Sequence, residues 1–512
     1  MVKQRLNELP DELIVTILSM LPTFKESVAT RLISKRYEDP WKLAPDVTLE
    51  DDDEESVMTF LYGSLLSKDS PILDKLHLKL TKNHSASAID FWVQTAVNRN
   101  VRKLRFDLFG GTLELPNCLS TCTTLKSLIL REVSIKVVPD RFSLPSLKSL
   151  HLFSVNFSNY QSVPSLLKTC PHLEYLVINQ TSYVTYDGES APLWFYLSSL
   201  KSLHLCSVIF SGSHSLTRLL RSCRVLKSLV INQTKCDYEM FEVVFPPWSG
   251  LSTIKTLHLS SVNFSSDESV EKLLESCKAL EDLVITRTKD DNVSLFNITV
   301  PTLKSLSINN VKVKGDDATG FVINAPALER LNIKDTVSDY LMFYHMPEVT
   351  TASIEVVCDQ SENLVGSLTF IQHLSLCSPI STPYISGAVF FFLEHLELCT
   401  CSAIWANLLG SILNDAPRLQ SIKLMSKCSG RFKRPMELWT TPTVVPECLL
   451  KHLEMFEWRE YDGTEQERKV AAYILGNATC LKMATFSTSC RDKYTVLQKM
   501  SRVSEICRLE FE

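Results

Sequence analysis

Glycine is scarce in this chain, which has 14 glycines among 512 residues and one adjacent pair, Gly110-Gly111. Loops that wrap phosphate groups are rich in glycine, yet neither a P-loop nor a G-x-G-x-x-G phrase occurs. A G-x-S-x-G nucleophile elbow and an H-E-x-x-H zinc motif are missing as well. These absences disfavour an enzyme, and we predict no catalytic residue.

Closely spaced cysteine pairs of the C-x-x-C type are also missing, although the chain has 16 cysteines. Disulfides persist in oxidising compartments and are rare where thiols are kept reduced. The simplest interpretation is a reducing intracellular location, in the cytoplasm and/or the nucleus, where the thiols stay free. We predict neither a metal ion nor another cofactor.

Long apolar runs and a basic excess are absent too. The longest apolar run, residues 388–393, is far too short to cross a bilayer. Lys3 and Arg5 lead into an amphipathic segment rather than an apolar stretch, so we expect no secretory signal. The net charge of −5 lacks the basic excess typical of nucleic-acid-binding proteins. We therefore expect partners other than membranes and nucleic acids.

The N-terminal segment has the pattern of two short amphipathic helices. Pro10 suits a first helical position, and apolar residues then recur one turn apart as far as Leu21. Thr23 and Glu26 have the spacing of a capping box at the start of a second helix. A segment of roughly 40 residues rarely buries enough surface to fold alone without metals, disulfides or association. We expect this segment to bind a partner.

Three phrases of this segment resemble an F-box, and they are Leu9-Pro10-Asp11-Glu12-Leu13, residues 17–22 and Ser34-Lys35-Arg36. The resemblance implies a three-helix module, here residues 1–48, that binds the Skp-type adaptor of cullin-based ubiquitin ligases. Tyr37 and Pro40 depart from the family, and a proline there should end the third helix early. The alternative is a helical pair that caps the next domain. The candidate adaptor-contact or supporting residues are Leu9, Pro10, Leu13, Ile14, Ile17, Leu18, Leu21, Pro22, Val28 and Leu32.

From Leu73 onward the phrase L-x-x-L-x-[L/I] recurs with apolar substitutes, in steps of roughly 21 to 28 residues, within the range of leucine-rich repeats. Its starts are Leu73, Val101, Leu125, Leu147, Leu173, Leu200, Leu226, Ile254, Leu280, Leu303, Leu328, Val349, Ile371, Leu393 and Leu419. No unit can bury its apolar face alone, so stacking creates the core. We predict an α/β solenoid over residues 73–430, with a curved parallel sheet and a helical or irregular outer side.

Two details of the repeats have structural explanations. The asparagine common in leucine-rich repeats is replaced by Val155, Thr181, Val208, Thr234 and Val262, so we expect a different and irregular turn. Four cysteines stand three residues before a repeat leucine, where Ala325 and Ala416 stand in other units. We expect these four to be small buried apolar side chains. They are Cys122, Cys170, Cys223 and Cys277.

Strand alternation predicts which repeat residues are exposed, because side chains of a strand point alternately to its two faces. The residue between the last two leucines should form an exposed column: His77, Arg105, Ile129, His151, Val177, His204, Val230, His258, Val284, Ser307, Asn332, Ser353, Ser375, Glu397 and Lys423. Such a mildly polar strip suits a protein or peptide better than a phosphate backbone. The alternative is that duplication copied these residues without any binding role. The candidate target-binding residues, which include two from the preceding column, are His151, Tyr175, His204, His258 and Asp282.

The two ends of the solenoid differ from the repeats. Residues 49–72 form an acidic connector, in which Glu50–Glu55 favours a helix start over an acidic docking tail. Residues 431–512 begin with the basic Arg431, Lys433 and Arg434, which we expect in a solvated loop. Within this part, residues 445–486 resemble the FBD domain of plant F-box/leucine-rich-repeat proteins. It should cap the exposed end of the solenoid, with Thr464 and Glu467 as a capping box.

These parts together predict a non-catalytic adaptor. The family resemblance implies a substrate receptor of a Skp-cullin-F-box ubiquitin ligase. In it the F-box binds the Skp-type adaptor and through it a cullin, and the repeats capture a target protein whose identity the sequence does not give. The alternative function is a leucine-rich-repeat scaffold with a degenerate F-box that recruits no ligase.

Overall fold

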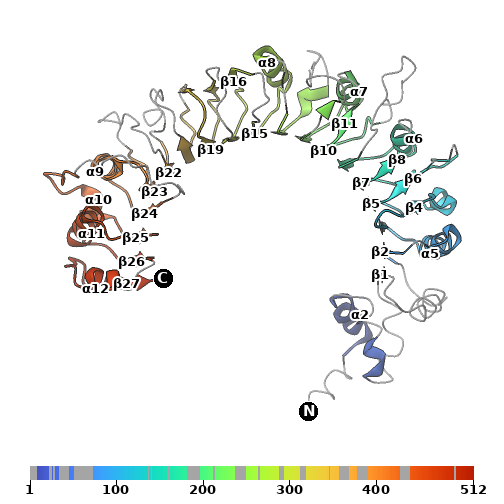
Figure 1. The fold of residues 1–512 in the computed structure, drawn as a ribbon, viewed down its shortest axis with the longest axis horizontal. Coiled ribbons are helices and arrows are strands. Elements are labelled where there is room, and N and C mark those ends of the chain that lie inside the picture. Colours follow the sequence, from blue (N-terminus) through green and yellow to red (C-terminus); the bar gives the residue numbers. More distant parts are fainter. Residues whose placement is uncertain are drawn as a thin grey trace. The chain divides into compact units, whose positions relative to one another are not determined.

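Two compact units, Met1–Ile254 and Lys255–Glu512, make up the chain. The computed structural model describes residues 9–21, 26, 29–33, 45–50, 73–82, 84–136, 138–139, 141–157, 162–181, 197–210, 214–233, 235–236, 250–262, 264, 266–287, 293–311, 319–344, 346–356, 368, 370–377, 390–426, 439–488 and 492–512. Figure 1 shows that each unit carries a main sheet of parallel strands along one side and helices along the other.

The main sheet of the first unit consists of five-residue parallel strands, each paired with the next one of the sheet along the chain. The second and fourth residues of every strand are buried, as the alternation of apolar residues predicts. The strands are β1 (Asp46–Glu50), β2 (Lys75–Lys79), β3 (Lys103–Asp107), β5 (Ser127–Arg131), β7 (Ser149–Phe153), β9 (Tyr175–Asn179), β10 (Ser202–Cys206) and β12 (Ser228–Asn232).

The main sheet of the second unit continues the same pattern of parallel pairing between successive strands. Its strands are β14 (Thr256–Ser260), β15 (Asp282–Thr286), β17 (Ser305–Asn310), β19 (Arg330–Asp335), β21 (Thr351–Val356), β22 (His373–Cys377), β23 (His395–Cys399), β24 (Ser421–Met425), β25 (Met455–Trp458), β26 (Met483–Phe486) and β27 (Arg508–Phe511). The predicted leucine-rich solenoid with a parallel sheet is therefore confirmed within each unit.

Helices and short strands return the chain on the opposite side of each main sheet (Figure 1). The predicted helical outer side is confirmed at Leu166, Leu219 and Leu273, because each lies in a helix with its apolar residues buried. In the first unit the outer elements include α5 (Ala86–Asn98), β4 (Thr112–Leu113), η4 (Asn117–Thr121), β6 (Ser134–Ile135), β8 (Asn156–Phe157), α6 (Ser162–Lys168), β11 (Ile209–Phe210), α7 (His214–Ser222), β13 (Lys235–Cys236) and η6 (Gly250–Thr253). In the second they include α8 (Asp267–Ser276), β16 (Leu295–Thr299), β18 (Gly320–Asn324), β20 (Tyr340–Phe343) and α9 (Trp405–Asp415).

A left-handed residue directly after the strand replaces the missing asparagine of the repeat turn. Ser154, Gln180 and Ser207 have φ values of 51°, 50° and 50°. Their N–H groups donate to the last strand residue of the following repeat, for example Ser154 N to the Asn179 carbonyl at 2.8 Å. The Ser154 hydroxyl also donates to Gln180 Oε1 at 2.9 Å. The next residue, such as Val155, is then turned into the core, which explains why valine suits that position.

The four repeat cysteines are buried, as predicted, and they fill the space that Ala325 and Ala416 fill elsewhere. The Cys170 thiol donates to the Leu166 carbonyl at 3.5 Å, and the Cys223 thiol donates to the Leu219 carbonyl at 3.3 Å. Burial raises the pKa of both thiols to about 12, so they stay protonated near neutral pH. These cysteines are inert packing residues.

The N-terminal segment contains α2 (Asp11–Ser19) and η1 (Thr30–Leu32). Pro10 is the N-cap and Asp11 the first helical residue, so the helix begins one residue later than the predicted start at Pro10. Thr23, Pro22, Val28, Ser34, Tyr37, Pro40 and Trp41 lie outside the described residues. The three-helix F-box arrangement therefore stays a prediction.

The main sheet starts before Leu73, which differs from the predicted boundaries at residues 48 and 72. Asp46–Glu50 is a strand, β1, that pairs in parallel with β2, because Val47 and Leu49 alternate with polar residues and are buried. Glu50 thus ends a strand and accepts a hydrogen bond from Lys79 at 3.2 Å, so the expectation that it starts a helix is wrong. The rest of the acidic run, residues 51–55, and the helix expected behind it lie outside the described residues.

The C-terminal region continues the sheet of the second unit and does not merely cover its end. Strands β25, β26 and β27 add to β24 in parallel, and α10 (Glu447–Lys451), α11 (Glu465–Asn477) and α12 (Asp492–Gln498) lie opposite them. The predicted capping box is confirmed, because Thr464 accepts from the Glu467 N–H while Glu467 accepts from the Thr464 N–H. In α11, Ala471, Ile474 and Leu475 are buried and Ala472 is exposed. Arg431, Lys433 and Arg434 lie outside the described residues.

A search for membrane-spanning segments covered the described helices. None of these helices combines the length and the apolar composition that crossing a bilayer requires.

Candidate functional site

Helix α2 has two apolar stripes with different environments. Ile14 and Leu18 are 1% and 3% exposed, so they belong to the interior of the segment. Leu13, Ile17 and Met20, which follow one another at helical spacing, are 49%, 44% and 77% exposed. The second stripe is an apolar face that is exposed at the surface of α2.

The predicted adaptor-contact residues therefore divide into two groups, a division that the sequence left open. Ile14 and Leu18 are positioned to support the segment, whereas Leu13 and Ile17 are available for contact. Leu32, at the end of η1, is 83% exposed. Leu9 and Leu21 are half-buried and Pro10 is exposed, while Pro22 and Val28 lie outside the described residues.

The second candidate surface is the strand face, the side of each main sheet that carries the first, third and fifth residues of its strands. In the first unit the strand register aligns the third residues as neighbours in one column, as predicted: His77, Arg105, Ile129, His151, Val177, His204 and Val230. In the second unit a corresponding column runs from His258 through Val284, Ser307, Asn332, Ser353, Ser375, Glu397 and Lys423.

Histidine and tyrosine are the most distinctive groups in the middle of the first unit's strand face. The His151 ring is hydrogen-bonded to the Ser149 hydroxyl at 2.8 Å and lies beside the Phe153 ring. Burial, and then the nearby His204, lower the pKa of His151, which favours its neutral form. Tyr175 is 47% exposed and has serines, Ser149 and Ser202, on both neighbouring strands. This part of the surface is mildly polar and can offer both hydrogen bonds and an aromatic face.

The other two candidate target-binding residues are brought together in the second unit. His258 on β14 and Asp282 on β15 have Nε2 and Oδ2 3.2 Å apart, and both side chains are partly exposed. Their strands pair so that Asp282 lies diagonally across from His258, beside Thr256. The His258 ring and the Asp282 carboxylate form a directional polar pair at this position.

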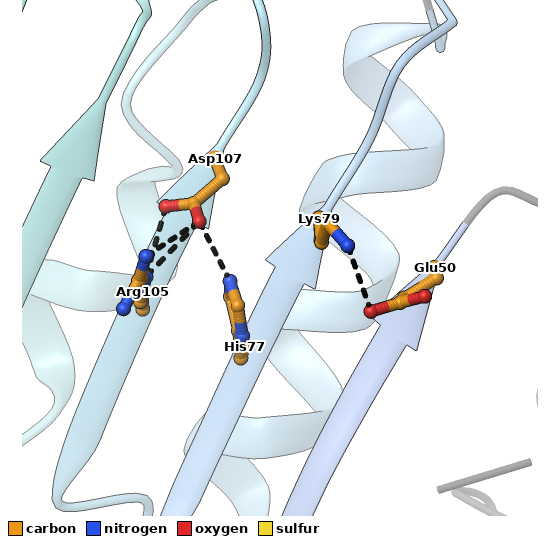
Figure 2. A network of polar contacts seen from close by, with 5 residues as sticks. All are labelled: Glu50, His77, Lys79, Arg105 and Asp107. Carbon is orange, nitrogen blue, oxygen red and sulfur yellow. Dashed lines mark hydrogen bonds and ion pairs between the residues drawn. The ribbon is translucent and has the colours of Figure 1, made fainter. Parts of the chain in front are cut away.

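A charged cluster in the first unit was missed by the sequence prediction. Asp107 ends β3 with its side chain 6% exposed, although it lies on the strand face. It accepts a hydrogen bond from Arg105 Nη2 at 2.7 Å and another from Arg105 Nε at 2.9 Å, and His77 Nε2 lies 3.1 Å away on β2 (Figure 2). The sequence contained a sign of this cluster. Asp107 comes two residues after Arg105, so its side chain is on the same face of the strand as the predicted column.

The Asp107 carboxylate of this cluster is ionised near neutral pH. Burial raises the pKa of Asp107, but the hydrogen bonds from His77 and Arg105 outweigh it and lower the pKa to about 2. Lys79 and Glu50 form a second ion pair, 3.2 Å apart, beside it on β2 and β1 (Figure 2). An ionised carboxylate already engaged by two partners suits rigid recognition or support of the strand face better than proton transfer.

Comparison with protein families gives three matches. The FBD family matches residues 441–486, and the family "FBD-associated F-box protein At5g56370, LRR repeats" matches residues 89–187. The Leucine Rich Repeat family matches residues 199–224 and 254–277. These matches lie in the same parts of the chain as the sequence predictions.

Several proteins of Arabidopsis thaliana are similar to the chain over its whole length. The FBD-associated F-box protein At5g56560 is 47% identical, with 99% of each chain covered. The F-box/FBD/LRR-repeat protein At5g56570 is 40% identical, with 99% of this chain and 92% of the relative covered. Among solved structures, a plant peptide hormone receptor, RGFR1 in complex with RGF2, has 11% identity and a TM-score of 0.38, with 92% of this chain and 80% of that chain covered.

The Asp107 cluster predicts a pH-dependent contribution to stability. The pKa of Asp107 lies below its ordinary value of 3.8 in the folded chain, so its contribution is complete above about pH 4 and is lost as the pH falls toward about 2. We expect Asp107→Asn to lower the free energy of unfolding by about 1–3 kcal/mol near pH 7, because Arg105 and His77 lose the negative charge and one of the two acceptor oxygens. Chemical denaturation across this pH range measures the difference from wild type.

The control for this prediction is Asp90→Asn, which removes an exposed carboxylate from α5. The control should have nearly wild-type stability throughout the pH range. A difference between wild type and Asp107→Asn that stays constant from pH 7 to pH 2 contradicts the account, because it would mean that the carboxylate charge contributes nothing.

Proposed function

This chain belongs to the plant family of F-box/FBD/LRR-repeat proteins, which are adaptor-type proteins, and from that membership we propose that it is a substrate receptor of a Skp-cullin-F-box ubiquitin ligase. Its N-terminal segment binds the Skp-type adaptor, which connects it to a cullin. Its strand face captures a target protein for ubiquitination. The chain itself is non-catalytic, and catalysis belongs to the partner subunits.

The observation that carries this proposal is the exposed apolar stripe of α2. A partner protein would bury the exposed side chains of Leu13, Ile17 and Met20. Burying such side chains stabilises a complex by about 25 cal/mol for each Å² of apolar surface. Ile14 and Leu18 hold the helix in its segment and keep this stripe outward. In this proposal Leu9, Pro10, Leu21 and Leu32 lie at the rim of the contact.

The proposed target site consists of strand-face residues with directional polar groups. His151, Tyr175 and His204 lie on neighbouring strands of the first unit, and His258 and Asp282 lie together in the second. Aromatic and polar side chains presented by a rigid sheet are suited to bind a protein surface, because little conformational entropy is lost when they are covered. The mixed charge of the strand face, with Asp107 and Glu174 among its neighbours, favours a protein partner over a phosphate backbone.

The alternative function is a protein-binding scaffold whose F-box no longer recruits a ligase. It rests on Tyr37 and Pro40, the two departures from the family pattern, which lie outside the described residues. Binding to the adaptor distinguishes the two functions, since only the receptor requires it.

The apolar stripe predicts the effect of a single charge. We expect Ile17→Asp to weaken binding of the full chain to a Skp-type adaptor at least tenfold, because an aspartate in an apolar interface loses its hydration without gaining a partner. Isothermal titration calorimetry or a pull-down with the purified adaptor measures the loss. The thermal unfolding midpoint should change little, because Ile17 is 44% exposed.

The matched control is Val225→Asp, which introduces the same charge at a repeat residue that is 42% exposed. It should bind the adaptor as wild type does. If Ile17→Asp binds with unchanged affinity, or if the wild-type chain does not bind at all, the scaffold alternative replaces the receptor.

The strand face predicts a second, separable loss. We expect that wild type and Ile17→Asp retain at least one protein equally. His204→Asp or His258→Asp should retain that same protein at least tenfold less. The second variant places a carboxylate beside Asp282, where like charges repel. Quantitative mass spectrometry of proteins captured by the full chain measures the retention, with Arg224→Asp, an exposed position before β12, as control. Equal retention of every captured protein by all variants would mean that duplication copied these columns without a binding role.

A further inference from the structure

Three cysteines lie together on the strand face of the second unit. Cys377 is the last residue of β22, Cys399 is the last residue of β23, and Cys401 follows two residues later. Their three Sγ atoms all lie within 4.8 Å of one another. Cys377 and Cys399 are 1% and 4% exposed, and Cys401 is half-buried, so solvent reaches the cluster from one side only.

The strand register explains why these residues meet although 22 positions separate the first two. Leu376 and Leu398 are partners in the ladder between β22 and β23, so the next residue of each strand comes to the same place on the strand face. The Thr400 N–H donates to the Met425 carbonyl at 2.9 Å, and residues 400 and 401 lie in the turn that directly follows β23. This turn brings Cys401 close to Cys399, with their Sγ atoms 2.9 Å apart, and the Ser426 hydroxyl is 3.4 Å from Cys401 Sγ.

This donor set differs from the other described cysteines of the chain. Three of those cysteines are single residues that follow a helix, and burial raises their pKa values to about 12. They are Cys170, Cys223 and Cys277. In the cluster three sulfur atoms converge, and convergence of soft donors is what a thiophilic metal ion requires. Zinc–sulfur bonds are about 2.3 Å long, so tetrahedral coordination places sulfur atoms about 3.8 Å apart. The three Sγ atoms of the cluster lie within 4.8 Å of one another, and those of Cys399 and Cys401 are 2.9 Å apart.

We propose that Cys377, Cys399 and Cys401 form a metal site for a thiophilic ion with a filled d shell, Zn²⁺ or Cu⁺. The three thiols lose their protons to solvent as the ion binds, and three thiolates hold it. Cu⁺ is satisfied by three sulfur ligands, whereas Zn²⁺ takes a water as its fourth ligand from the side where Cys401 meets solvent.

The site joins the ends of two neighbouring strands to the segment that follows β23. Cys377 and Cys399 follow His373 and His395 by four residues on the same two strands. The rings of the two histidines stack on each other with centroids 4.5 Å apart. A bound ion would therefore stiffen the part of the strand face that carries these exposed polar residues. This inference is independent of the proposed ligase function, and it departs from the sequence prediction that the chain holds no metal.

The test uses the full-length chain, reduced with a non-thiol reductant. Cd²⁺ serves as the optical probe, because cadmium–thiolate bonds absorb in the near ultraviolet, and Zn²⁺ and Cu⁺ are titrated in competition with chromophoric chelators. We expect one tightly held equivalent of Zn²⁺ or Cu⁺ per chain, and an affinity that falls with decreasing pH because protons compete for the thiolates. Cys399→Ser and Cys401→Ser should each weaken this binding at least tenfold.

The matched control is Cys206→Ser, which changes a half-buried cysteine at the same strand position, the last residue of β10. It should keep the wild-type affinity and the wild-type rise in the thermal unfolding midpoint on adding Zn²⁺. Circular dichroism checks that Cys401→Ser, the change at the most exposed of the three, is folded. Equal metal affinity in wild type, Cys399→Ser and Cys401→Ser overturns the proposal. A disulfide between Cys399 and Cys401 in the reduced wild-type chain also overturns the proposal, because it would occupy two of the ligands. Mass spectrometry detects it as a mass lower by two hydrogen atoms in the peptide that contains both residues.

Discussion

Burial of the second and fourth residues of every repeat strand is the constraint on which this molecule depends. A five-residue strand with two buried leucines cannot exclude water alone, and parallel pairing with its neighbours in register is what covers them. The same register aligns the exposed residues in columns on the strand face. After β5, β7, β9, β10, β12 and β14 a left-handed residue, such as Ser154 or Ser207, makes the tight turn that follows the strand. The valine that follows can then pack into the core.

The fold separates two surfaces by their chemistry. The stripe of Leu13, Ile17 and Met20 on α2 is apolar and exposed, which suits a permanent helical partner. The strand face is polar, with hydrogen-bonded groups such as His151 and His258 and charges held by partners, as for Asp107. In the proposed receptor the first surface connects the chain to the ligase and the second selects the protein to be modified.

Much of the fold follows from the sequence because its signals are local and repeated. Alternation predicts the strands and the columns from His77 to Val230 and from His258 to Lys423, and near-identical copies fix their register. The Thr464 and Glu467 capping box was predictable from spacing alone. The C-terminal region was expected to be a cap, whereas Phe456 and Phe486 alternate with polar residues and extend the parallel sheet.

The parts that escaped prediction depend on contacts between distant residues. Helical spacing gives α2 apolar stripes but does not tell which stripe the rest of the segment covers, so the sequence left the roles of Ile14 and Ile17 undivided. Asp107 looked like one more strand-end residue until His77 and Arg105 were found to engage it. The sequence analysis missed the cysteine cluster because the C-x-x-C motif detects cysteines that are close in sequence. Cys377 and Cys399 meet across neighbouring strands.

In the proposed receptor the N-terminal stripe alone docks the chain to its adaptor and leaves the strand face free. Amide hydrogen exchange of the full chain with and without a purified Skp-type adaptor tests it most directly. We expect the adaptor to slow amide exchange only in the N-terminal segment, including α2. The exchange rates of the strands from β2 to β12 and from β14 to β27 should stay unchanged. Unchanged exchange in α2 under saturating adaptor, or protection that falls on the strands instead, would contradict it.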